Sequence, residues 1–144
     1  MFFIALLLAF CSADPGIIDM KFCPDKPVNL DIDIMKVEYQ KPAERIRTNY
    51  TIYMEVIKPH TDLVLKWHVE YYWGSLYISS YQYDDRDVCI AIEGGCPTKL
   101  GPNQMKEIGY IKESVTLPGW YSLVLEMTDN NLYNSCFHGW VYLF

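Results

Sequence analysis

The sequence predicts an all-β protein, built as an antiparallel two-sheet β-sandwich. Hydrophobic and polar side chains alternate along several segments, which is typical of strands with one buried face. Short turn sequences such as "KPHTD", "LPG" and "TDNN" separate these segments. No segment has the convincing 3.6-residue periodicity of an amphipathic helix. Roughly seven short strands in a single domain are therefore expected.

Each predicted strand follows from its own pattern. "NLDIDIM", "IRTNYTIYMEVI", "LVLKWHVEYYW" and "WYSLVLEMT" each place apolar residues on one face. "SLYISSYQY" alternates in the same way, and "CFHGWVYLF" is apolar on both faces. The apolar faces are, in chain order, Leu30, Ile32 and Ile34; Ile46, Tyr50, Ile52, Met54 and Val56; Leu63, Leu65, Trp67, Val69, Tyr71 and Trp73; and Tyr121, Leu123, Leu125 and Met127.

The first residues, "MFFIALLLAFCSADPG", predict a secretory signal peptide. The apolar run from Phe2 to Phe10 is too short to span a bilayer, and small residues follow it. We expect cleavage after Ala13, which leaves residues 14–144 as one mature domain. The alternative, a buried N-terminal strand, does not account for length, flanking residues and position together.

The cysteines support an oxidising compartment. Removing Cys11 with the signal peptide leaves Cys23, Cys89, Cys96 and Cys136, an even number, as expected for a disulfide framework. Four cysteines allow three pairings, and a bond across the short 89–96 loop would leave Cys23 for Cys136. The six-residue gap fits neither a structural zinc pair nor a Cys-x-x-Cys redox motif.

Charge and modification signals also fit a secreted protein. The net charge is −6 with no basic patch, which argues against a nucleic-acid partner. Asn49 begins the sequon Asn-Tyr-Thr and falls on the polar face of its strand. We therefore expect a surface position and glycosylation there.

No sequence motif indicates an enzyme, a cofactor or a metal. The chain lacks a Gly-x-Ser-x-Gly elbow, a His-Glu-x-x-His helix and a phosphate-binding glycine loop. His60, His68 and His138 are not at ligand spacing. "YDDRD" lacks the spaced oxygen ligands of a calcium loop, so a charged hairpin end is the preferred interpretation.

The whole mature chain resembles the ML lipid-recognition domain family. The resemblance rests on the signal peptide, an early cysteine, the close pair ending in Cys-Pro, and "LPGWYSLVLEMTDNNLYNSCF". This family includes Niemann-Pick-type lysosomal sterol carriers, mite group-two allergens and phosphatidylglycerol/phosphatidylinositol transfer proteins. The early Cys-x4-Cys bridge of many sterol carriers is missing here. That difference and the "LPG-W-Y" turn are more similar to the phospholipid-transfer branch.

The resemblance implies the fold details, the disulfides and the site. It implies an immunoglobulin-like sandwich with an apolar cavity between the sheets, and Cys89–Cys96 and Cys23–Cys136 bonds. A single lipid would enter tail-first, and aromatics at the open end would contact the membrane transiently. The implied cavity residues are Met54, Val56, Leu65, Trp67, Val69, Tyr71, Ile78, Tyr110, Tyr121 and Leu123. The implied portal residues are Tyr81, Val115, Leu117 and Trp120.

Two functions are thus predicted from the sequence. The first is a secreted or lysosomal carrier of a sterol or phospholipid. Such a carrier would be a monomer, would contact membranes transiently and would catalyse no reaction. The second is a closed β-sandwich recognition module of immune or adhesion type, in which the 12 Tyr, 4 Trp and 6 Phe residues simply fill a core.

Overall fold

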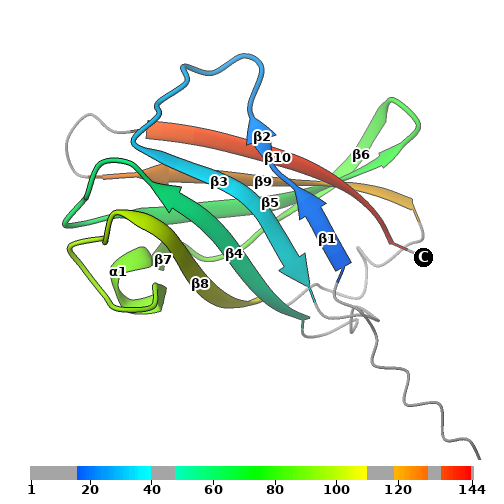
Figure 1. Cartoon of the computed structure of the whole chain (residues 1–144). Coiled ribbons are helices and arrows are strands. Elements are labelled where there is room, and N and C mark those ends of the chain that lie inside the picture. Colours follow the sequence, from blue (N-terminus) through cyan, green and yellow to red (C-terminus); the bar gives the residue numbers. More distant parts are fainter. Residues whose placement is uncertain (1–15, 40–47, 110–118, 130–133, 144) are drawn as a thin grey trace, which may run out of the picture.

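Two antiparallel sheets pack face to face in the computed structural model, which describes residues 16–39, 48–109, 119–129 and 134–143 (Figure 1). The first sheet contains, in spatial order, β1 (Gly16–Asp19), β3 (Ile32–Tyr39), β4 (Thr48–Val56) and β8 (Gly101–Gly109). The second contains β2 (Lys21–Phe22), β10 (Asn134–Leu143), β9 (Gly119–Thr128), β5 (Val64–Trp73) and β6 (Leu76–Gln82), with β7 (Arg86–Asp87) also paired to β5. The predicted all-β sandwich is confirmed.

The predicted alternation is confirmed along the central strands. In β4, every second residue from Tyr50 to Val56 is buried, and Asn49 on the other face is exposed, as expected for its sequon. β5 and β9 bury their predicted faces from Leu65 to Tyr71 and from Tyr121 to Met127. Ile46 lies outside the described residues, as do the predicted signal peptide and its cleavage site.

Two residues on predicted apolar faces are exposed instead. Trp73 is 60% exposed and Leu30 is 63% exposed. The Trp73 indole N–H donates to the Tyr71 hydroxyl at 2.6 Å, at the end of β5 beside the turn into β6. Leu30 precedes the first residue of β3. Alternation alone does not show where a strand passes beyond the sheet that covers it.

β7, β8 and α1 (Val88–Ala91) are elements in the middle of the chain that the sequence did not predict. The inward positions of β8 are Asn103, Met105 and Glu107, all buried. Two polar residues on the buried face hide the alternation. α1 is a single turn whose N-cap, Asp87, accepts a hydrogen bond from the Cys89 amide at 2.9 Å.

The N-terminal segment joins the two sheets. β1 pairs with β3 in the first sheet, and β2, one residue later, pairs with β10 in the second. A side chain at Gly139 of β10 would meet Ile18 and Met20 at 2.5–2.7 Å, so glycine permits this close crossing. The Cys23–Cys136 disulfide then fixes the segment to β10, with a Cα–Cα distance of 5.3 Å.

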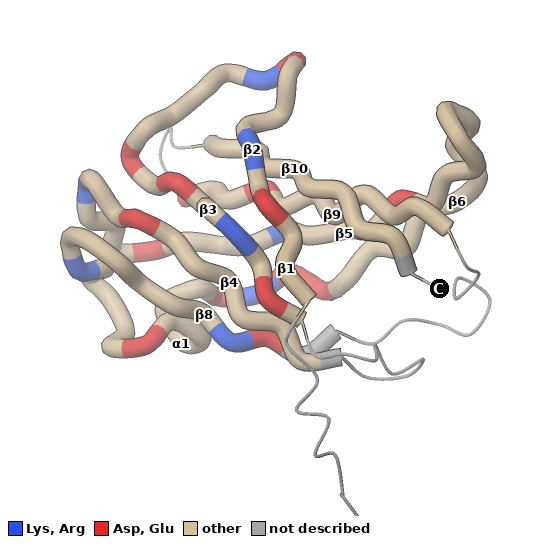
Figure 2. The backbone as a smooth tube through the Cα atoms, turned by 45° about the vertical axis from the view of Figure 1, so that its right-hand side comes forward, with Lys and Arg blue, Asp and Glu red and all other residues tan. Residues whose placement is uncertain are grey.

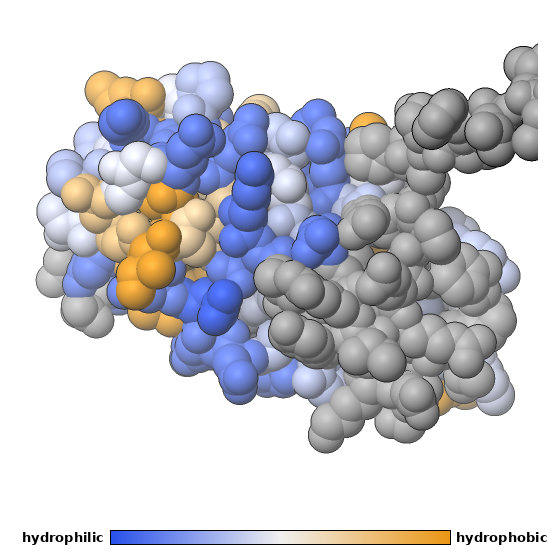
Figure 3. Space-filling view, turned by 90° about the horizontal axis from the view of Figure 1, so that it is seen from below, coloured by the Kyte–Doolittle hydropathy of each residue, from blue (hydrophilic) through white to orange (hydrophobic). Residues whose placement is uncertain are grey.

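Large hydrophobic side chains are exposed at both ends of the sandwich. Aliphatic residues Ile57, Ile90 and Leu100 are exposed near α1, and the view from below shows hydrophobic side chains on that side among hydrophilic ones (Figure 3). The exposed residues of the opposite end, around the β5–β6 hairpin, are mostly aromatic. No helix among the described residues is long and apolar enough to cross a membrane.

Candidate functional site

Most of the predicted cavity residues lie between the two sheets. They belong to one continuous buried cluster and come from both layers. Those buried are Met54, Val56, Leu65, Trp67, Val69, Tyr71, Tyr121 and Leu123. Tyr110 lies outside the described residues. These residues therefore share one buried interior between the sheets, and their types are those that line both pockets and cores.

Ile78 does not belong to this interior. Its side chain is 37% exposed, so its predicted inward position is wrong. The register between β5 and β6 shifts here, because Tyr71 pairs with Ser79 whereas Tyr72 pairs with Tyr77. Ile78 is the extra residue of this bulge, and the strand alternation is interrupted at this point.

The predicted portal residues do not form one group. Tyr81 is partly buried and packs against the core cluster. Trp120 is half-exposed on the outer face of the second sheet, where its ring contacts Tyr142 at 5.5 Å. Its neighbour Tyr121 takes the inward position instead. Val115 and Leu117 lie outside the described residues.

An aromatic cluster occupies the interior where β4 faces β5. The rings of Trp67 and Tyr83 stack, with 3.8 Å between their centroids and 11° between their planes. Tyr50 meets Trp67 edge-on at 5.4 Å, and Tyr81 meets Tyr83 edge-on at 5.0 Å. These four aromatic residues connect the two sheets within the buried core.

A buried carboxylate adjoins this cluster. Glu107 of β8 pairs across the strands with Tyr50, and its side chain is almost completely buried. Arg86 of β7 reaches in from a half-exposed position, and its Nε donates to Glu107 Oε2 at 2.7 Å. We call Tyr50, Trp67, Tyr83, Arg86 and Glu107 the aromatic–carboxylate cluster.

Several polar atoms of this cluster have unused hydrogen-bonding capacity. Trp67 Nε1 and Glu107 Oε1 are buried without a hydrogen-bond partner among the described residues, and the Tyr83 hydroxyl makes no bond of good geometry. Burial, and then the neighbouring Tyr50 hydroxyl, raise the pKa of Tyr83. Unpaired buried polar atoms are uncommon in folded proteins and call for an explanation. A donor and an acceptor buried within one cluster suit the polar group of a ligand, such as a hydroxyl.

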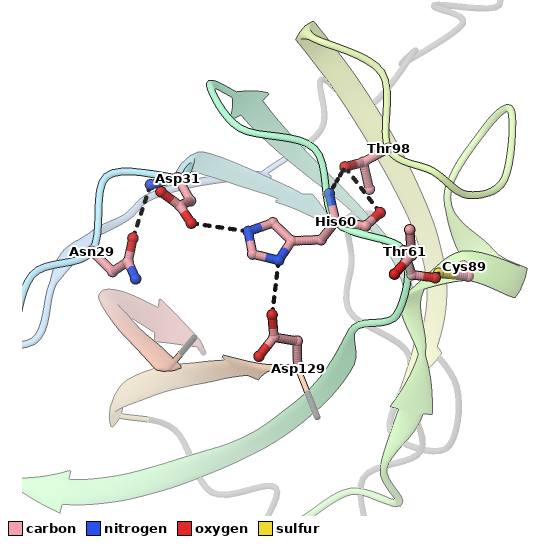
Figure 4. A network of polar contacts seen from close by, with 7 residues as sticks. All are labelled: Asn29, Asp31, His60, Thr61, Cys89, Thr98 and Asp129. Atoms are coloured by element: carbon pink, nitrogen blue, oxygen red, sulfur yellow. Dashed lines mark hydrogen bonds and ion pairs between the residues drawn. The ribbon is translucent and has the colours of Figure 1, made fainter. Parts of the chain in front are cut away.

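A second polar cluster lies where the chain connects β4 to β5. His60, in the connection between β4 and β5, is buried between two carboxylates (Figure 4). Its Nε2 lies 3.1 Å from Asp31 Oδ2 and its Nδ1 lies 3.0 Å from Asp129 Oδ2. Each ring nitrogen therefore has a carboxylate oxygen within hydrogen-bond distance. Since Asp31 precedes β3 and Asp129 follows β9, this His60 clamp joins the two sheets.

Backbone contacts hold the clamp residue in place. The His60 amide donates to Thr98 Oγ1 at 2.9 Å, and the Thr98 amide donates to the His60 carbonyl at 3.0 Å. The Asp31 amide donates to Asn29 Oδ1. Thr98 follows the loop closed by the Cys89–Cys96 disulfide, whose Cα–Cα distance is 5.0 Å. The sequence analysis missed this site because His60, Asp31 and Asp129 are far apart in the chain.

A surface groove of about 300 Å³ lies on the outer face of the first sheet. Met35, Tyr53, Glu93, Lys99 and Gln104 are among its lining residues. Hydrogen bonds from Tyr53 and then Lys36 lower the pKa of Glu38 beside it. Its charged and amide groups distinguish this groove from the apolar interior.

Metal chemistry and known relatives add no further assignment. Within the described residues, no three His, Cys, Asp or Glu side chains gather as a metal-binding group. "YDDRD" is not a simple hairpin end, because Arg86 and Asp87 pair with β5 as β7. Both disulfides are formed as predicted and are consistent with an oxidising environment.

No family model matches the chain, and neither does any curated protein.

Proposed function

We propose that this protein is a non-catalytic lipid carrier of the ML type, secreted or delivered to the lysosomal or endosomal lumen. It carries or presents a single sterol or phospholipid between its two sheets. The sequence resemblance motivates the family assignment. The two disulfides support the compartment, because such bonds persist in oxidising surroundings.

The observation that carries the proposal is the pair of unused polar atoms inside an apolar interior. Trp67 Nε1 is a donor and Glu107 Oε1 an acceptor, both buried. Buried polar groups cost free energy unless they are paired. An amphipathic lipid supplies both kinds of contact, since its chain or ring system replaces water along the apolar walls and a hydroxyl or ester group meets the cluster.

The test begins with the protein purified from a eukaryotic secretion host under non-denaturing conditions. Native mass spectrometry should show a bound mass that disappears after lipid extraction, and the extract identifies the lipid. Apo protein incubated with cholesterol or with phosphatidylglycerol vesicles should take up one molecule. If the native protein is empty and takes up neither lipid, the carrier function is wrong.

A matched pair of variants locates the ligand. Trp67→Phe removes the indole N–H while keeping an aromatic ring, and Trp140→Phe makes the same change at an exposed position. Loss of one hydrogen bond of about 1.4 kcal/mol corresponds to roughly tenfold weaker binding. With a monomeric short-chain lipid as the ligand, so that no membrane contact contributes, we expect that loss for Trp67→Phe and no change for Trp140→Phe. Equal affinities would place the ligand elsewhere.

One observation favours the second candidate, a closed recognition module. The close stacking of Trp67 on Tyr83 is the packing expected of a filled core. Under that function the protein remains empty in the uptake experiment and binds a macromolecule through its surface. The same mass measurement therefore separates the two functions.

A further inference from the structure

The β5–β6 hairpin ends in exposed apolar residues. Trp73 is 60% exposed and Leu76 is 62% exposed, and they flank a turn at Gly74. The hairpin projects beyond the rest of the sandwich (Figure 1). We call Trp73 and Leu76 the hairpin tip. Two large apolar side chains at a projecting tip are convex and do not form a pocket for a small ligand.

A row of aromatic residues continues from the tip across the outer face of the second sheet. Tyr77, Tyr72, Trp120 and Tyr142 are cross-strand partners on β6, β5, β9 and β10. Ring contacts of 5.8 Å for Tyr72–Tyr77 and 5.5 Å for Trp120–Tyr142 connect members of the row. Trp140 adds a contact to Tyr72 at 5.0 Å. We call these five residues the aromatic face.

The described residues of the hairpin and of the aromatic face carry almost no charge. Residues 71–83 contain no Asp, Glu, Lys or Arg, and the hairpin shows neither charge colour (Figure 2). Glu70, next to the aromatic face, is acidic and accepts a hydrogen bond from Tyr72. With a net charge of −6, the protein has no electrostatic attraction to an anionic membrane. Recognition here must therefore depend on apolar and aromatic contacts.

We propose that the hairpin tip and the aromatic face bind the interfacial region of an electrically neutral lipid bilayer. Tyr and Trp have an apolar body and a polar end, and they concentrate where a membrane meets water. The tip residues enter the acyl boundary, and the aromatic face lies against the headgroups. The rings of the face are tilted by 62–74° to one another, which does not provide the flat platform suited to a sugar ring.

This inference rests on the proposed function and deepens it, because a lipid carrier must meet a donor membrane. It shares Trp120 with the predicted portal, but its contact surface is the outer face of the second sheet. The buried core cluster reaches this end of the sandwich through Tyr71, which packs against Gly119 at the start of β9. Binding there brings the end of the lipid-carrying interior to the membrane without covering the His60 clamp.

The test measures co-flotation of the full-length mature protein with phosphatidylcholine vesicles and with phosphatidylserine vesicles. The double variant Trp73→Ser/Leu76→Ser should bind phosphatidylcholine about tenfold or more weakly, because two half-exposed apolar side chains no longer leave water. The matched control is Leu30→Ser/Leu100→Ser, which changes residues that are 63% and 66% exposed at the other end. It should bind as the unaltered protein does, and added salt should change neither result.

Several results would overturn the inference. These are equal phosphatidylcholine binding by the two double variants, binding confined to phosphatidylserine, or release by soluble glycans. A concentration-dependent dimer that the tip substitutions abolish would instead assign the surface to self-association. Native mass spectrometry on the same samples separates the two proposals. If a tip variant still contains lipid but floats with vesicles normally, only the proposed membrane-binding surface is wrong. If the protein contains no lipid but its flotation depends on the tip, only the proposed carrier function is wrong.

Discussion

The two ends of the sandwich are held together in different ways. At one end, the His60 clamp, the Thr98 hydrogen bonds and the Cys89–Cys96 disulfide link segments from both sheets. At the other end, the β5–β6 hairpin projects from the second sheet alone, and its contacts are ring packing and a tight turn. The clamp end has charged neighbours for its exposed aliphatic residues, whereas the hairpin end is aromatic and uncharged.

The difference indicates that one end of the sandwich contributes mainly to stability and the other end mainly to association. Buried hydrogen bonds to carboxylates and a disulfide make the clamp end costly to open. At the hairpin end, large apolar side chains are exposed to water. They would become buried only when this end binds the proposed membrane partner. We therefore expect substitutions at the clamp end to affect folding and those at the hairpin end to affect association.

The largest effect is expected from His60→Gln. Glutamine has one amide group in place of two ring nitrogens on opposite sides of an imidazole, so it cannot keep the contacts to both Asp129 and Asp31. A buried carboxylate that loses its hydrogen-bond partner costs about 1–3 kcal/mol or more, and we expect about 3 kcal/mol because Asp129 is buried. Urea unfolding followed by circular dichroism measures the loss.

His68→Gln provides the matched control on the outer face of β5. His68 Nε2 also lies 3.1 Å from a carboxylate, that of Glu70, but both side chains are partly exposed. An exposed pair contributes at most about 1 kcal/mol. Equal losses in the free energy of unfolding for the two histidine variants would show that the His60 clamp stabilises the fold no more than an exposed pair does.

The next effect concerns the short disulfide loop. Cys89→Ala/Cys96→Ala removes the cross-link that holds α1 and the following turn. Closing so short a loop stabilises by about 2.5 kcal/mol in the chain-entropy model. We expect a loss near that value in thermal unfolding, with vesicle flotation unchanged. A loss of flotation in the folded variant would show that the two ends are coupled.

Most of the fold could be predicted from the sequence because burial follows strand alternation. β4, β5 and β9 have apolar inward faces, so period-two reasoning placed Met54, Trp67 and Leu123 correctly. The prediction failed where a strand extends past its cover, as at Trp73, and where a bulge changes the register, as at Ile78. Such features depend on the partner strand, which local sequence does not specify.

The polar features of the site could not be predicted for the same reason. Glu107 is buried because β8 faces the aromatic cluster, yet a glutamate in a polar segment predicts a solvent-exposed position. His60 meets Asp31 and Asp129 through connections between different strands. No spacing rule applies to residues that only the completed sandwich brings together.

A smaller effect is expected at the turn of the hairpin. Gly74 has φ of +60°, and a side chain there would meet nothing within 4 Å. Gly74→Ala therefore adds only the cost of a left-handed backbone for a residue with a Cβ, about 1 kcal/mol. Gly74→Asn should cost less, since asparagine tolerates this conformation. Equal destabilisation of 3 kcal/mol or more by both variants would contradict the open environment of the turn.

The smallest effect is a titration on the aromatic face. A hydrogen bond from the Tyr72 hydroxyl to Glu70 Oε2, 2.6 Å long, is the main cause that raises the pKa of Tyr72 to about 12. Because this value exceeds that of an unfolded tyrosine, about 10, the stabilisation is complete below pH 10 and is lost as the pH rises from about 10 to about 12. Glu70→Gln removes the charge, so Tyr72 should ionise at lower pH. Ultraviolet difference titration should then show one additional tyrosinate near pH 11 in Glu70→Gln relative to the unaltered protein, a pH between those two pKa values. The same substitution made in a Tyr72→Phe background should leave the titration unchanged. An identical shift in both backgrounds would assign the effect to another tyrosine, and the Tyr72–Glu70 contact would then be absent in solution.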